Sequence, residues 1–239
     1  MAPARLPAAM LTAVPALADM PAMMRRRVDR LGRLACQVAY AVQPEGQTQA
    51  VPMVFASRYG DAARSLSLLG DLSQAQALSP TGFGLSVHNA ISALYAMARA
   101  DVQNAVVVAA GRATVLAALT EAAALLADGA PEVLVVYYEA PLPESYADFQ
   151  DEPPCEYAWA WRVASSSRSS GTGMRVSLSL APATGHPAVA PQDAGETQAW
   201  PAGLAVLRHM LRQRAMPQAD TLVRSDRQGT QWSWSTAHA

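Results

Sequence analysis

The chain has 239 residues, of which 51% are hydrophobic and only 15% are charged. This length is enough for one large domain with a substantial core, and the apolar composition predicts surface that another subunit covers. The formal net charge of −1 excludes a general electrostatic attraction to nucleic acid or to an anionic membrane. No apolar run approaches the roughly 20 residues that cross a bilayer, so we expect no membrane span and no nucleic-acid partner.

Helical and strand patterns alternate over residues 23–138. Apolar residues recur at helical spacing, which predicts helices at 23–42, 62–78, 87–99 and 114–127. Short apolar runs, among them AVVVAA and VLVVYY, predict buried strands at 51–57, 105–110 and 133–138. Because these strands are apolar on both faces and alternate with helices, we expect a parallel-type sheet that is covered on both sides.

The pattern becomes looser after the third predicted strand. Segments 156–163 and 174–180 alternate apolar and polar residues, and a Ser/Gly-rich turn separates them, which predicts an antiparallel hairpin. Farther along the chain, the pattern predicts a short helix at 202–214 and one or two strands within 221–235.

We predict a single domain over residues 1–239. Residues 1–20 are expected to be flexible, and the Pro-, Ala- and Gly-rich stretch 182–201 is expected to form a mobile loop. The N-terminal stretch contains a modest apolar run, but Pro7 and Pro15 interrupt it, which disfavours a signal peptide. We therefore expect the protein to be cytoplasmic.

The cysteines and histidines carry no metal-binding pattern. Cys36 and Cys155 belong to no C-x-x-C pair, and the four histidines show no metal-ligand spacing. We expect no metal and no other cofactor.

Arginines crowd the N-terminal half of the first predicted helix, at Arg25, Arg26, Arg27, Arg30 and Arg33. Positive charge at this end opposes the helix dipole, so the cluster is mildly unfavourable unless acidic groups face it. It is either an ordinary solvated face or a docking patch for an acidic partner.

The strongest candidate for a functional site is the segment 79–90 (SPTGFGLSVHNA), which we call the elbow. A turn of small residues before a helix presents backbone N–H groups that attract an anion or a carbonyl oxygen. Ser86 and His88 are a nucleophile type and a base type, but side chains two residues apart rarely meet at about 3 Å. The alternative is that Ser86 caps the helix and that His88 and Asn89 hydrogen-bond to loop backbone. No G-x-S-x-G motif is present, so a hydrolase of the usual kind is not supported.

Several segments share the pattern of one known family. They are Ser-Pro-Thr at 79–81, Ser-Val-His-Asn-Ala-Ile at 86–91, AVVVAAG at 105–111 and three supporting stretches at 24–35, 54–60 and 134–138. Over residues 20–165 the chain resembles the nucleophile-bearing part of β-ketoacyl synthases. It is most similar to the short β-ketoacyl synthase-like N-terminal-domain proteins of aryl-polyene and related fatty-acid-type synthases. This resemblance implies an α/β fold that forms a thiolase-like half, a layered α-β-α arrangement with a mostly parallel mixed sheet.

The departures from the family pattern concern its catalytic residues. Family enzymes carry a Cys at the elbow and use two histidines from their C-terminal half. Here the equivalent of the Cys falls within 83–87, where no Cys is present, and Cys36 and Cys155 lie elsewhere. His209 and His238 lie in segments that match neither histidine motif, and the chain is expected to end before that C-terminal half. Without a thiolate and paired histidines no acyl-enzyme forms, so we predict no catalytic residue.

The resemblance implies a chain-length-factor-like subunit that pairs with a full-length ketosynthase in a heterodimer. The subunit would stabilise the heterodimer and border its acyl channel, in aryl-polyene or related polyketide or fatty-acid-type biosynthesis. The residues expected to replace the active site are Ser86, Val87, His88 and Asn89. Those expected at the acyl channel or the interface are Phe83, Leu85, Ile91 and Tyr95, for which plain core packing is the alternative.

Two other functions remain open. The chain could be a stand-alone acyl-transfer or thioester enzyme that uses Ser86 or His88. It could also bind an acyl carrier protein, whose acidic helix would meet the arginine cluster. The residues expected in that contact are Arg25, Arg26, Arg27 and Arg30.

Overall fold

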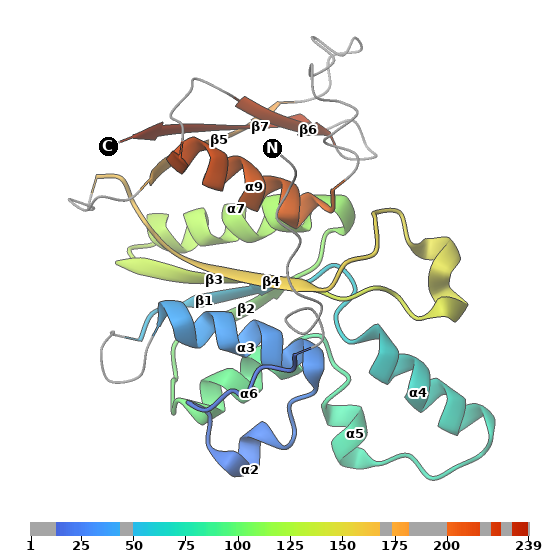
Figure 1. The fold of residues 1–239 in the computed structure, drawn as a ribbon. Helices are drawn as coiled ribbons and strands as arrows, with labels where there is room; N and C mark the ends of the chain where they lie inside the picture. The colour runs from blue at the N-terminus through green and yellow to red at the C-terminus, as the bar shows by residue number, and fades with distance from the viewer. Residues whose placement is uncertain are drawn as a thin grey trace.

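Stacked layers of helices and sheets build the fold, seen in a computed structural model of the chain (Figure 1). The structure describes residues 13–43, 50–167, 174–181, 200–215, 221–225 and 231–238. Helices α3 (Arg30–Val42) and α6 (Ala90–Ala98) cover one face of a four-stranded sheet. Helices α7 (Thr114–Ala127) and α9 (Ala202–Ala215) cover the other face. The predicted α-β-α arrangement is therefore confirmed.

The central sheet is mixed and mostly parallel, as predicted. Its strands are β1 (Met53–Ala56), β2 (Ala105–Val108), β3 (Glu132–Glu139) and β4 (Tyr157–Ala164). They lie in the order β2-β1-β3-β4, and β1 runs parallel to both of its neighbours while β4 is antiparallel to β3. The carboxyl ends of the three parallel strands meet at one edge of the sheet, where loops from different parts of the chain come together.

Continuous apolar strands form because both faces of the sheet are buried. Phe55 and Val136 point into a cluster with α3 and α6, whereas Val54 and Val135 point into a second cluster with α7 and α9. Successive side chains of a strand point to opposite faces, so a strand between two helical layers needs an apolar residue at every position. This is the physical reason for the MVFA and VLVVYY runs.

Helix caps correct two details of the sequence-based prediction. The helix predicted over 23–42 is divided into α2 (Ala22–Arg25) and α3, because the Asp29 carboxylate caps α3 by accepting the Gly32 amide. The predicted loop 79–86 contains a short helix, α5 (Pro80–Gly84), because Ser79 caps it and Pro80 occupies its first turn.

Helix α7 has the predicted bounds, whereas the helix predicted over 62–78 already ends at Ser73. Helix α6 begins at Ala90 rather than at residue 87. The structure adds two 3-10 turns, η1 (Gly111–Ala113) after β2 and η2 (Glu144–Phe149) after β3. Helix α4 spans Ala62–Ser73.

The predicted hairpin of 156–163 with 174–180 is wrong. Strand β4 pairs along its whole length with β3, and β5 (Met174–Ala181) pairs with β7 (Gln231–His238) instead. Together with β6 (Thr221–Ser225), β5 and β7 form a separate antiparallel sheet. Alternating residues show that a segment has one buried face, but they do not show which strand it pairs with.

The second sheet adds a layer beyond the predicted α-β-α half. It lies over α7 and α9 in Figure 1. Met174, Val176 and Leu178 of β5 pack against the cluster that contains these two helices. The outer side of this helical layer is therefore covered by the chain itself.

Two predicted flexible regions lie mostly outside the described residues. Of the stretch 182–201, only the last two residues are described, and of residues 1–20 the description begins at Ala13. Leu17 and Met20 are buried in the core beside α3. In the part of the chain that the structure describes, no helix is long and apolar enough to cross a membrane.

Helix α9 lies directly on an aromatic stack, and Gly203 makes this contact possible. The Tyr137 and Trp159 rings stack at 5.2 Å, and the Trp159 Nε1–H donates to the Gly203 carbonyl at 3.2 Å. A Cβ at Gly203 would lie 2.5 Å from Tyr137 Cε1 and 2.7 Å from the Tyr157 hydroxyl. The close approach of α9 to the sheet thus excludes any side chain here.

We expect Gly203→Ala to lower the free energy of unfolding by about 1–3 kcal/mol, the usual cost of overpacking a core. Urea titration followed by circular dichroism measures this change. The matched control is Gly70→Ala in α4, where a Cβ meets nothing within 4 Å and where Ala favours the helix. Equal stability of the Gly203→Ala protein and the wild type would contradict the expectation.

Candidate functional site

The elbow lies against the carboxyl end of β1. The His88 Nε2 atom is 2.9 Å from the Ser57 carbonyl oxygen, one residue beyond the strand. In open α/β sheets this edge is the usual place for a binding site. The elbow thus lies at an edge of the sheet where a binding site can form.

The Ser86 hydroxyl donates to the Phe83 carbonyl at 2.8 Å. Ser86 therefore does not cap helix α6, contrary to one of the sequence-based alternatives. The N-cap residue is Asn89, and its side chain makes no capping hydrogen bond. The elbow therefore consists of α5, a tight turn and an α6 N-terminus whose first amides receive no side-chain cap from Asn89.

The His88 ring is fixed by a backbone contact and by a glycine. Because the Ser57 carbonyl can only accept, the hydrogen of the ring is on Nε2 and is donated to it. Gly60 has a φ of +59°, and a Cβ there would lie 2.8 Å from His88 Cδ2. His88 and Ser86 form no hydrogen bond with each other, so the geometry does not provide a nucleophile activated by a base.

A buried carboxylate supports the turn that receives His88. At the end of β3, Glu139 accepts the Arg58 amide and, at 3.4 Å, the Ser57 hydroxyl. The Ser57 Oγ atom in turn accepts the Gly60 amide at 2.9 Å. Burial, reinforced by the nearby Glu152 carboxylate, raises the pKa of Glu139 to about 7. The sequence-based prediction missed this residue, although a charged residue directly after VLVVYY is an unusual signal.

Arg58 joins the loops that follow β1 and β3. Its side chain is almost fully buried and forms ion pairs with Asp151 and Glu152. Arg112, in the turn after β2, also pairs with Asp151, at 3.3 Å. Burial raises the pKa of Asp151, but the hydrogen bond and the charge of Arg58 outweigh it, so that the pKa is lowered overall. All three parallel strands are therefore connected at their carboxyl ends.

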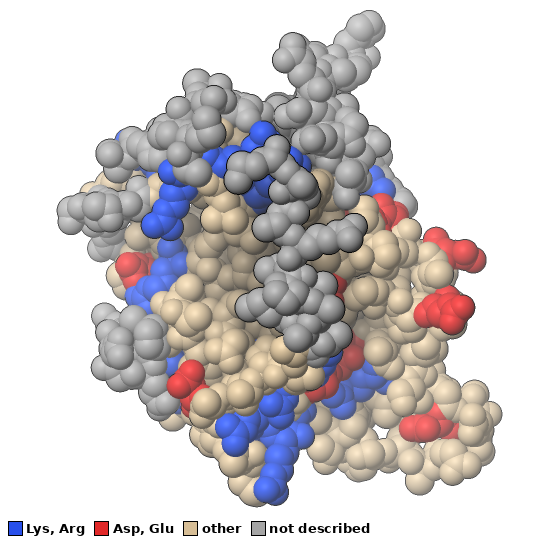
Figure 2. Space-filling view, in the orientation of Figure 1, with Lys and Arg blue, Asp and Glu red and all other residues tan. Residues whose placement is uncertain are grey.

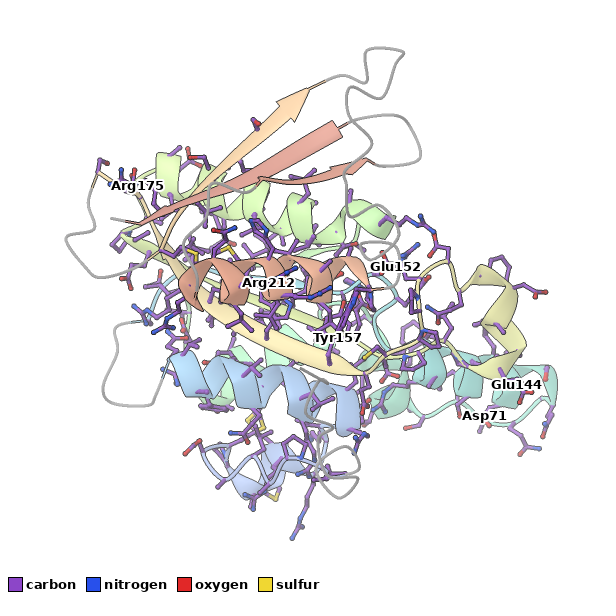
Figure 3. The ribbon with its side chains drawn as sticks, turned by 45° about the horizontal axis from the view of Figure 1, so that its top comes forward. Asp71, Glu144, Glu152, Tyr157, Arg175 and Arg212 are labelled. Carbon is purple, nitrogen blue, oxygen red and sulfur yellow. The ribbon has the colours of Figure 1, made fainter. Side chains whose placement is uncertain are left out.

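Glu152 connects this network to α9 on the opposite face of the sheet. Its Oε2 atom accepts the Ala202 amide at the start of α9, at 3.3 Å. Figure 3 shows Glu152 beside the beginning of this helix. The network therefore reaches from the elbow through the sheet edge to the second helical layer.

The four residues predicted at an acyl channel or interface divide into two groups. Tyr95 is fully buried and donates to Gln43 Oε1 at 3.2 Å, and Ile91 is buried beside it in the same cluster. Phe83 is 61% exposed, and Leu85 is half-buried at the edge of the core. In addition, Val87 of the elbow is 44% exposed.

The arginine cluster is only partly available to a partner. Arg30 forms an ion pair with Glu156 at 2.7 Å, and Arg33 donates to the carbonyls of Arg25, Val28 and Pro15. Figure 2 shows basic side chains gathered over the part of the molecule where α2 lies. Arg26 and Arg27 are the exposed members of the cluster.

The thiols lie away from the elbow. Cys36 is fully buried in α3, and burial raises its pKa to about 12. Cys155 is half-buried in the chain that leads into β4, and burial raises its pKa as well. His209 is buried in α9, on the opposite face of the sheet from α6. Among the described residues, no group of three His, Cys, Asp or Glu side chains could hold a metal ion.

The layered α/β fold is thiolase-like, and solved structures of ketosynthases share this fold. One chain of the structure titled "Ketosynthase (ApeO) in Complex with its Chain Length Factor (ApeC) from Xenorhabdus doucetiae" matches with a TM-score of 0.73 and 24% identity. The match covers 98% of this chain and 88% of that one, so the two are similar in length. At this identity the likeness shows the fold.

Two further solved structures agree. The ishigamide ketosynthase/chain length factor matches with a TM-score of 0.68 and 14% identity, covering 96% of this chain and 89% of that chain. A beta-ketoacyl synthase from Burkholderia phymatum STM815 matches with a TM-score of 0.62 and 12% identity, and the match covers 95% of this chain and 86% of that chain.

The family itself is shown by sequence. The chain matches the family of beta-ketoacyl synthase N-terminal domains over residues 2–235, and it belongs to this family. The family predicted from the elbow and the neighbouring strands is therefore confirmed. A search of curated proteins finds no significant match.

The buried Glu139 predicts a pH dependence of stability. Its pKa is raised from an ordinary value of 4.5 to about 7, so the folded state binds the proton more tightly than the unfolded chain. The resulting stabilisation is complete below the unfolded pKa and is lost as the pH rises through the folded one. Relative to the Glu139→Gln protein, we expect the wild type to lose about 1–3 kcal/mol between pH 4.5 and pH 8.

Urea titrations across this pH range measure the difference between the two proteins. The matched control is Glu144→Gln on η2, where the glutamate side chain is exposed. Parallel stability curves for Glu139→Gln and the wild type would show that the Glu139 proton is bound equally in both states.

Proposed function

We propose that this protein is the non-catalytic, chain-length-factor-like partner of a full-length ketosynthase. It would act in the cytoplasm, in aryl-polyene or related polyketide or fatty-acid-type biosynthesis. The observation that carries the proposal is an elbow of ketosynthase type without a thiol. Its Ser86 hydroxyl and His88 N–H both donate to backbone carbonyls. Such an elbow has a structural role, and the reacting thiol comes from the partner.

The edge of the central sheet supports pairing with another subunit. Strand β2 lies at one end of the described sheet, with β1 as its neighbour. Apolar side chains lie around this edge, including Val102, which is 95% exposed, and Met97, which is 59% exposed. An unpaired edge strand is a template for pairing with another chain, and an exposed apolar patch marks a contact surface.

The titles of two similar structures describe ketosynthases together with chain length factors. We extend such a partnership to this chain because its elbow and the end of β2 both contact Ser57, whose carbonyl receives His88 and whose amide donates to the Val108 carbonyl. In this arrangement Phe83, Leu85 and Val87 would border the acyl channel of the partner. Ile91 and Tyr95 would support this border from within the core, because both are buried.

The stand-alone enzyme fits the geometry less well. Ser86 and His88 are already hydrogen-bonded to backbone carbonyls, and they form no hydrogen bond with each other. Carrier binding is compatible with the proposed function, because Arg26 and Arg27 are exposed just beyond the end of α2. We therefore propose an acyl carrier protein as an additional, transient partner.

Co-expression with each full-length ketosynthase of the same genome tests the proposed function. We expect one of them to co-purify with this chain as a stable heterodimer and to make product only in that heterodimer. Replacing the nucleophilic Cys of the partner should abolish product, whereas Ser86→Ala in this chain should retain it. A ketosynthase that is fully active alone and forms no complex would refute the proposal, and loss of product in Ser86→Ala would favour the stand-alone enzyme.

The carrier contact has its own test. Arg26→Glu with Arg27→Glu should weaken binding of the acyl carrier protein to the heterodimer by about tenfold or more at low salt, and less at high salt. Fluorescence anisotropy at several salt concentrations measures this change. Arg30→Gln is an unsuitable control because Arg30 holds Glu156, so Arg175→Glu on the exposed face of β5 serves instead. Equal weakening by both variants would indicate a non-specific charge effect.

A further inference from the structure

Helices α4 and α5 form an arm, residues 62–85, that projects from the layered body (Figure 1). No side chain of either helix is buried. Leu69 is 52% exposed, Leu72 is 58% exposed, and the whole connection from residue 71 to residue 80 is exposed. A helical arm without buried side chains gains little stability from the body on which it stands.

Three leucines lie on one face of α4. Leu66, Leu69 and Leu72 follow one another at spacings of three, which brings them to the same side of a helix. Leu66 is half-buried, whereas Leu69 and Leu72 are exposed. Ser67 and Asp71 lie on the opposite side. Leu68 is directed toward α5, since a Cβ at Gly82 would lie 3.6 Å from the Leu68 Cδ2 atom. An amphipathic helix normally turns its apolar face toward a core. Here that face is open to solvent.

Ion pairs connect the base of the arm to the start of α3. Asp61 caps α4 by accepting the Arg64 amide at 3.0 Å. The Arg64 guanidinium pairs with Asp61 at 2.8 Å and with Asp29, the cap of α3, at 2.9 Å. These contacts attach the base of the arm to the start of α3.

The charges of the arm restrict what can cover it. Between residues 62 and 87 the only charged residues are Arg64 and Asp71, and Arg64 is used at the base. Asp71 lies toward the far end of α4 (Figure 3). With no available cation, this face attracts neither nucleic acid nor anionic lipid nor the acidic helix of a carrier protein. The partner that fits the exposed leucines of α4 is therefore an apolar protein surface.

We propose that the arm packs its Leu69 and Leu72 face against an apolar surface of the partner ketosynthase. This inference rests on the proposed function, which supplies the ketosynthase as the partner, and on the position of the arm beside the elbow. The arm overlaps the elbow at Phe83 and leads directly into Val87, and both of these side chains are exposed as well. A stable interface uses roughly 20–30 residues on each side, which the four residues of β2 do not supply. The arm, the elbow and β2 together supply that number.

Paired substitutions test the arm in the co-purified heterodimer. Leu69→Asp with Leu72→Asp should weaken the heterodimer by about 30-fold or more, as expected for apolar side chains at the centre of an interface. The control is Ser67→Asp, which places a negative charge on the opposite face of α4, and Leu69→Asp alone is compared with it as the variant of equal charge. Both leucines are exposed, so the isolated variant should keep the circular dichroism spectrum and melting temperature of the wild type. Equal affinity of the leucine variant and the wild type would overturn the inference.

Cross-linking identifies the occupant directly. A photoreactive p-benzoylphenylalanine at position 69 should form a cross-link to the ketosynthase, and the same group at position 67 should not. A cross-link at position 69 to a second copy of this chain, or none at all, would refute the arm inference while leaving the heterodimer intact. If the wild type forms no heterodimer with any ketosynthase, the proposed function fails, and the arm inference fails with it.

Discussion

The shape of the elbow depends on a hydrogen-bonded carboxylate at the end of the central sheet. Glu139 of β3 accepts from Ser57 and from the Arg58 amide, although Ser57 lies 82 residues earlier in the chain. These bonds fix the bend with which the chain leaves β1, and the Ser57 carbonyl then receives His88. A buried carboxylate is tolerated only where donors satisfy it, so the carboxylate and the bend stabilise each other.

The same region holds the polar side chains of Ser86 and His88 in place. The hydroxyl and imidazole groups that could react are occupied by backbone carbonyls, and these bonds contribute to stability. The elbow itself contains no thiol, since Cys36 is buried in the core on α3 and Cys155 lies just before β4. What the elbow offers to its surroundings is mainly apolar, at Phe83 and Val87. Its chemistry therefore fits a contact surface better than an active site.

Apolar surface is distributed unevenly over the molecule. On one side the chain covers α7 and α9 with its own second sheet, so this layer needs no partner. On the other side the arm, the elbow and the edge of β2 carry exposed apolar side chains and few charges. Since burial of apolar area drives association, a partner would gain most by binding to this second side.

The sequence by itself determined the three parallel strands of the central sheet, the helices that cover them and the family, because a strand between two layers must be apolar throughout and the elbow motif is specific. It could not determine the partners of β4 and β5, because alternation shows a buried face and not a neighbour. It also could not place Glu139 against Ser57 and Arg58, or show that Tyr95 is buried and Phe83 exposed. Those facts depend on contacts between distant segments, which only the tertiary structure decided.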